Sequence, residues 1–94
     1  MNNSIYCCTV ILGNLSTLET DKMKDNIIHF LKSFNYTDSE PEKVYEGDGN
    51  SSLYHYEIDI KYKHHSKIHV QRFADSLIAF CLFHRMAFYE HYLD

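Results

Sequence analysis

The sequence predicts an α+β fold in which a strand and a helix are followed by two strands and a long C-terminal helix. Three observations predict it. Residues 54–63 alternate strictly between apolar and polar side chains, residues 20–34 repeat apolar side chains at the helical period, and residues 66–93 contain neither Gly nor Pro. The 94 residues are expected to form a single α+β domain, 1–94, because that length supports one hydrophobic core.

The first predicted strand covers residues 5–12, IYCCTVIL, and is bounded by Asn and Ser before it and by Gly13 and Asn14 after it. Its apolar character does not alternate, so both faces of the strand are apolar. Strands of this kind are usually covered on both sides. We therefore expect this strand to need more cover than a single layer of helices provides.

The first predicted helix covers residues 20–34 and has one apolar face. Its start is open between a capping box that runs from Ser16 to Glu19 and an N-cap at Thr20 or Asp21. Asn35 is the expected residue just beyond its end, since Asn tolerates the left-handed conformation found there. The apolar face consists of Met23, Ile27, Phe30, Leu31 and Phe34.

Two strands are predicted next. Val44 and Tyr45 mark a short one, and residues 46–52 are dense in turn-forming residues, which predicts a hairpin loop. The alternation that follows predicts a half-buried antiparallel strand. Its apolar face is Tyr54, Tyr56, Ile58, Ile60 and Tyr62. We interpret these tyrosines as core residues rather than as an RNA-stacking surface, because the charged sequence motif of RNA-recognition folds is absent.

The second predicted helix is long and occupies residues 66–93. One stripe is expected to cover the sheet: Val70, Phe73, Ala74, Leu77, Phe80, Cys81, Phe88 and Tyr92. The opposite face of its second half is also apolar: Ala79, Leu82, Phe83, Met86, Tyr89 and Leu93. A contiguous exposed patch of large apolar side chains usually marks an interface. Burial of this patch beneath the chain's own loops is the alternative.

The predicted order, β-α-β-β-α, matches a ferredoxin-like split βαβ arrangement that lacks its fourth strand. In that arrangement the third strand lies centrally and the first strand becomes an edge. An apolar edge promotes aggregation unless another strand pairs with it or another element covers it. A homodimer formed through the long helix or the first strand would supply that cover.

The charge distribution points to a protein partner. The net charge is −4, and residues 19–59 hold ten acids against four lysines. An acidic chain is a poor direct ligand for nucleic acid, but it suits a partner with a basic surface. We predict electrostatic docking by Glu40, Glu42, Glu46 and Asp48 and apolar contact by Leu82, Phe83, Met86 and Tyr89. A solvated acidic loop is the alternative for the first set.

No pattern of catalytic, cofactor-binding or metal-ligating residues is found. His65 and His69 have a spacing that could share a metal ion, but they lack the accompanying ligands of known motifs. His84 is expected in the core, bonded to a tyrosine or a carbonyl group. The three cysteines are expected to be reduced core residues. Without a signal peptide or a span of about 20 apolar residues, the protein is predicted to be soluble and cytoplasmic, with no membrane association.

The resulting functional hypothesis is a small, acidic, non-enzymatic protein-binding module. An inhibitor or immunity-type protein fits this description, for example one from a phage or mobile element that blocks a host nucleic-acid-binding machine. Two alternatives stay open: a structural subunit of a homo-oligomer, and a small enzyme or ligand-binding domain that uses His84 and His91.

Overall fold

A computed structural model describes residues 3–13, 17–36, 41–45 and 54–93. Its elements are β1 (Ser4–Leu12), α1 (Thr17–Ser33), β2 (Glu42–Tyr45), β3 (Tyr54–His64), α2 (Lys67–Phe83) and β4 (Ala87–Leu93). The order is therefore β-α-β-β-α-β, and the α+β class predicted from the sequence is confirmed. The predicted absence of a fourth strand is wrong, because the last seven residues described form β4.

The four strands form one antiparallel sheet in the order β2-β3-β1-β4. β1 pairs with β3 on one side and with β4 on the other, so β1 is a central strand. The prediction that β1 is an unprotected edge is wrong for that reason. The edges are β2 and β4, and β4 carries an irregularity in its pairing with β1 between Cys7 and Cys8.

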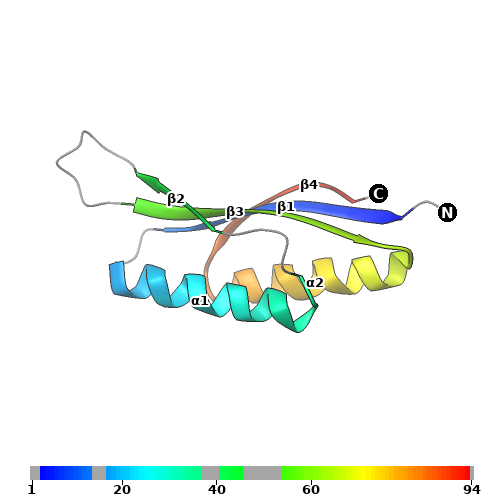
Figure 1. The fold of residues 1–94 in the computed structure, drawn as a ribbon, viewed down its shortest axis with the longest axis horizontal. Helices are drawn as coiled ribbons and strands as arrows, with labels where there is room; N and C mark the ends of the chain where they lie inside the picture. The colour runs from blue at the N-terminus through cyan, green and yellow to red at the C-terminus, as the bar shows by residue number, and fades with distance from the viewer. Residues whose placement is uncertain (1–2, 14–16, 37–40, 46–53, 94) are drawn as a thin grey trace.

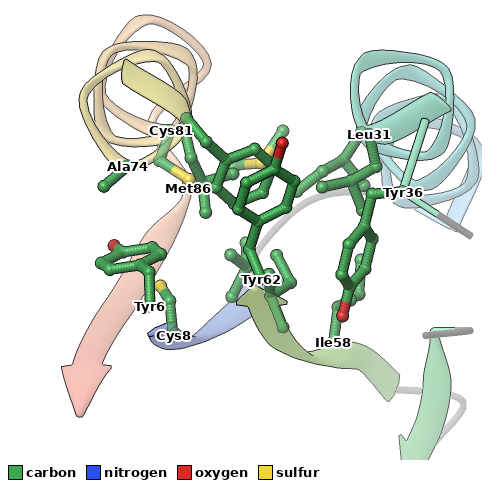
Figure 2. Packing of buried hydrophobic residues seen from close by; sticks show 14 of the residues in the cluster. Tyr6, Cys8, Leu31, Tyr36, Ile58, Tyr62, Ala74, Cys81 and Met86 are labelled. Atoms are coloured by element: carbon green, nitrogen blue, oxygen red, sulfur yellow. The ribbon is translucent and has the colours of Figure 1, made fainter. Parts of the chain in front are cut away.

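Both helices lie on the same side of the sheet (Figure 1). The core fills the space between them and this side, which we call the covered face. Its side chains come from every second residue of β1 and β3 and from the inward faces of α1 and α2 (Figure 2). Phe73 lies at its centre, where its ring stacks on Tyr62 with 4.0 Å between centroids. The predicted inward positions of β3 and of both helices up to Cys81 are confirmed where the structure describes their side chains.

The two helices end in the same way. Asn35 and Arg85 both adopt a left-handed conformation, with φ of 60° and 56°. At α1, the amide of Tyr36 donates to the carbonyl of Leu31 at 3.0 Å. At α2, the amide of Met86 donates to the carbonyl of Cys81 at 2.8 Å. Each bond joins an amide to the carbonyl five residues earlier. This 6→1 hydrogen bond is characteristic of the Schellman motif, which ends many helices.

This motif explains why the predicted helix to residue 93 is wrong. α2 starts where expected, after an N-cap at Ser66, but it ends at Phe83. Arg85 reverses the direction of the chain and sends residues 87–93 back along β1 as a strand (Figure 1). Phe88 therefore packs against the core from β4 rather than from a helix. The acidic residues Glu40, Glu46 and Asp48 and the predicted hairpin loop lie outside the described residues.

Candidate functional site

Of the predicted acidic site, only Glu42 lies within the described residues, and it is exposed at the start of β2. Of the 13 acids in the sequence, five lie outside the described residues: Asp38, Glu40, Glu46, Asp48 and Asp94. The described part therefore carries eight acids against all nine Lys and Arg residues. The described residues are therefore close to neutral, and the net negative charge of the protein comes from the residues outside them.

The predicted apolar site divides into three parts. Leu82 and Phe83 are 66% and 83% exposed at the end of α2. Met86 is only 7% exposed and belongs to the core, because the turn at Arg85 points it inward. Tyr89 is 60% exposed, but it lies on β4. The single helical stripe predicted from residues 79–93 therefore does not exist, and only its first part forms an exposed apolar end of α2.

The second face of the sheet carries no described helix (Figure 1), and we call it the open face. Its side chains alternate with those of the covered face and are half-buried or exposed. On the three longest strands they are Ile5, Cys7, Thr9 and Ile11 of β1, His55, Glu57, Asp59, Lys61 and Lys63 of β3, and Ala87, Tyr89 and His91 of β4. The first strand was expected to need more cover than one layer of helices provides, and among the described residues no element covers its open face (Figure 1).

A row of polar side chains crosses the open face. The hydroxyl of Thr9 donates to Oδ1 of Asp59 at 2.7 Å, and Nε2 of His91 lies 2.7 Å from the same hydroxyl oxygen. A threonine hydroxyl has one proton, so Nε2 of His91 must carry a proton and donate to it. The row fixes the Asp59 carboxylate in place at the side of an open hollow of about 380 Å³.

His84 belongs to a different surface. It caps the C-terminus of α2, with its ring 4.3 Å from that of Phe80. Together with His29 and Phe30, these residues line a shallow groove of about 420 Å³ between the two helices. His84 and His91 thus lie on opposite sides of the sheet. The alternative hypothesis of one pocket that uses both histidines does not match this arrangement.

Three histidines meet where β3 leads into α2. The ring of His64 stacks on His69 at 4.0 Å and on His65 at 4.3 Å, and its Nδ1 accepts a hydrogen bond from the amide of Ser66 at 2.9 Å. Desolvation and the two neighbouring imidazoles lower the pKa of His64. The pair considered from the sequence was His65 and His69, whereas the structure brings His64 against His69. No group of three or more potential metal ligands occurs among the described residues.

The two adjacent cysteines of β1 face opposite sides of the sheet. Cys7 is half-buried on the open face, whereas Cys8 is buried with Cys81 on the covered face. Burial raises the pKa of the Cys8 thiol and raises that of Cys81 to about 12, with a further contribution to Cys81 from Cys8. Cys8 and Cys81 are therefore neutral, unreactive thiols at physiological pH, as core cysteines are expected to be.

Within the described residues, no helix combines the length and apolar character that crossing a membrane requires.

Comparison with known proteins found no matching family model, no similar curated protein and no similar solved structure.

Proposed function

We propose that this chain is a small protein-binding module that contacts its target with the exposed end of α2. The observation that carries the proposal is the exposure of Phe83, a large aromatic side chain that is 83% accessible beside the equally apolar Leu82. Aromatic side chains are the commonest energetic anchors of protein interfaces when they enter a pocket on the partner. Exposing Phe83 beside a second large apolar side chain, Leu82, favours binding over a purely structural role for this turn.

The local environment of Phe83 supports an anchoring role. Its ring packs edge-on against His84 at 5.0 Å, and His84 in turn packs against Phe80, which contacts the core. The exposed ring is thus supported from below by a chain of aromatic contacts. A side chain held in this way loses little conformational freedom on binding, which increases affinity.

The acidic segment, residues 38–48, supplies the second half of the proposal. It holds five acids and one lysine, of which Glu42 and Lys43 lie in β2, whereas the described residues taken together are nearly neutral. Complementary charge increases the association rate with a basic partner and excludes acidic ones. A target with an apolar pocket on a basic surface fits both features. An inhibitor that occupies the basic groove of a nucleic-acid-binding protein is the role that uses them together.

The test compares two aspartate substitutions on the same helix. Phe83→Asp removes the proposed anchor, while Ile68→Asp changes an apolar side chain of similar exposure, 68%, at the other end of α2. We expect the wild-type protein and Ile68→Asp to retain the same host protein in a capture experiment, and Phe83→Asp to lose it.

The captured protein is then purified and titrated with each variant. Loss of a buried aromatic anchor should weaken binding by roughly 30-fold or more, corresponding to about 2 kcal/mol. Equal affinities for Phe83→Asp and Ile68→Asp would refute the role of the α2 end. Reversal of Glu40, Glu42 and Glu46 to lysine tests the acidic segment separately, and unchanged affinity would remove it from the proposal.

A further inference from the structure

The charges on the open face of the sheet are self-complementary. If the direction of the strands is reversed, acidic positions coincide with basic ones. Along β3, the outward side chains are His55, Glu57 and Asp59 in the first half, with His55 Nε2 3.0 Å from Oε1 of Glu57, and Lys61 and Lys63 in the second. The centre of this pattern is Ile60. Reversing the strand about Ile60 places each acid at the position of a lysine.

The neighbouring strand has the same symmetry about the same line. The outward side chains of β1 begin with Ile5 and end with Ile11, so the pattern is centred on Cys8. Cys8 and Ile60 are direct partners in the register of the two strands. The patterns of these two adjacent strands are therefore centred at the same level of the sheet. At that level β4 contributes Glu90, which pairs with Cys8 and is flanked by Tyr89 and His91.

We propose that the open face binds the open face of a second copy of this chain, with the strands of the two sheets antiparallel. The two-fold axis lies between the sheets and crosses β1 near Cys8 and β3 near Ile60. In a two-fold interface, each contact occurs twice. Glu57 meets Lys63 of the partner subunit, Asp59 meets Lys61 of the partner subunit, and Ile5 meets Ile11 of the partner subunit.

The geometry of sheet packing permits these contacts. Sheets that pack face to face lie about 10 Å apart with their strands aligned to within about 30°. Lysine and glutamate side chains are long enough to meet across that distance, and the isoleucines of β1 fill the space beside them. The Asp59 carboxylate is already held by Thr9 and His91, so pairing it with a lysine costs little additional ordering.

The charge pattern also disfavours a two-fold axis that runs along β3. Such an axis would place each lysine of β3 opposite the same lysine of the second copy. Like charges in direct opposition across an interface are destabilising. Reversal of the strands is the orientation in which both halves are complementary, and this property selects a second copy of the chain as the occupant of the open face.

The available area suits a moderately weak dimer. The strands contain 31 residues, and each occupies about 3.3 Å along the strand and about 4.8 Å across it. The flat area is therefore about 500 Å² per copy, or about 1,000 Å² for both, which is near the lower limit for a specific interface. We expect dissociation in the micromolar range and a strong dependence on salt.

The test uses two complementary charge reversals. In Glu57→Lys and in Lys63→Glu, each homodimer would place like charges together at both symmetric contacts. An equimolar mixture of the two variants would restore an opposite-charge pair at both contacts. We expect sedimentation equilibrium at low salt to show a dimer for the wild type, a dissociation constant increased at least tenfold for each variant alone, and recovery in the mixture.

Two controls make the result specific. Lys22→Glu on the exposed part of α1 changes the net charge by the same amount as Lys63→Glu and should leave the dimer intact. Phe83→Asp should also leave it intact, so failure of this inference is distinguishable from failure of the proposed function. A second measurement is the reaction of Cys7 with a thiol reagent, which dimerisation should slow.

Several results would overturn the inference. One is a wild-type protein that stays monomeric at several hundred micromolar in low salt. Another is a dimer that survives both charge reversals, or one that Phe83→Asp or Lys22→Glu dissociates. Variants that fold by circular dichroism but fail to pair in the mixture would overturn the antiparallel register.

Discussion

The two faces of β1 differ in what the chain supplies to cover them. Tyr6, Cys8, Val10 and Leu12 are fully buried beneath the helices, whereas the residues between them are only half-buried on the open face. The two sets are similarly apolar in sequence. The described elements of the chain cover one face of this central strand and leave apolar side chains on its other face partly exposed. The comparison locates the unsatisfied surface of this molecule on the open face of the sheet.

The largest expected difference between the two faces is in the reactivity of their cysteine thiols. Cys81 is fully buried and its pKa is raised to about 12, so at pH 8 only about one part in 10⁴ of it is thiolate, whereas Cys7 is half-buried on the open face. At low protein concentration, we expect a thiol reagent to modify Cys7 at least 1,000-fold faster than Cys81, with Cys8 also protected. Mass spectrometry of the native protein against time measures the rates.

Cys7→Ser is the control for that experiment, since it should remove the fast reaction and leave the slow ones. In denaturant all three thiols should react at similar rates. Fast reaction of Cys8 in the native protein would contradict the opposite orientation of the two adjacent side chains.

Truncation of isoleucine on each face is the next test. Ile58 is fully buried on the covered face, and Ile11 is half-buried on the open face. Ile58→Ala should lower the free energy of unfolding by about 2–5 kcal/mol, because it removes buried methyl groups and leaves a cavity. Ile11→Ala should lower it by about 1 kcal/mol or less for the monomer. Urea denaturation at low micromolar concentration measures both, and equal losses would show that the open face is covered in the monomer.

Two buried tyrosines test whether polar groups on the covered face are excluded from water. The hydroxyl of Tyr36 accepts a hydrogen bond from the amide of Lys61 at 3.0 Å. The hydroxyl of Tyr6 is fully buried beside the thiol of Cys8, a weak acceptor, and makes no conventional hydrogen bond with the described residues. Burial, followed by this thiol contact, raises the pKa of Tyr6.

Tyr36→Phe should therefore lower the free energy of unfolding by about 1–3 kcal/mol, because a backbone donor loses its acceptor. Tyr6→Phe removes a buried polar group that is poorly paired, and we expect a change between zero and a gain of about 1 kcal/mol. Thermal and chemical denaturation of the two variants measure the difference. A loss above about 1 kcal/mol for Tyr6→Phe would show that its hydroxyl is well bonded in the folded protein.

Sequence patterns predicted the covered face well and the end of the chain poorly. The inward positions of β3 and of both helices follow from periods of 2.0 and 3.6 residues, which burial enforces directly. The end of α1 was predicted because Asn35 is a residue type that tolerates the left-handed conformation. The same turn at Arg85 gave no signal, since Arg rarely adopts it. Without a Gly or Asn there, the apolar residues 86–93 fit a helix as readily as a strand.

The candidate surfaces before the turn at Arg85 were predictable from sequence, whereas those after it were not. Leu82 and Phe83 lie just before the turn, so their exposure was predictable from the helical period alone. The placement of Tyr89 and His91 on the open face depends on the turn and on the sheet that residues 87–93 join. The row of Asp59, Thr9 and His91 joins three strands that are far apart in sequence. Strand order must be known before such a row can be found, and no local pattern contains it.

The smallest predicted effect concerns Arg85, the residue that carries the chain from the helix layer to β4. A non-glycine residue in the left-handed region costs about 1 kcal/mol, and Asn costs less because its side chain bonds locally. Arg85→Gly should therefore raise the free energy of unfolding by about 0.5–1 kcal/mol, and Asn35→Gly by less than half of that. Arg85→Ala separates the backbone effect from the side chain, because it keeps the strained conformation and should not stabilise. If Arg85→Gly were destabilising while Arg85→Ala was neutral, the turn would not be strained, and the placement of β4 would depend on its pairing with β1 alone.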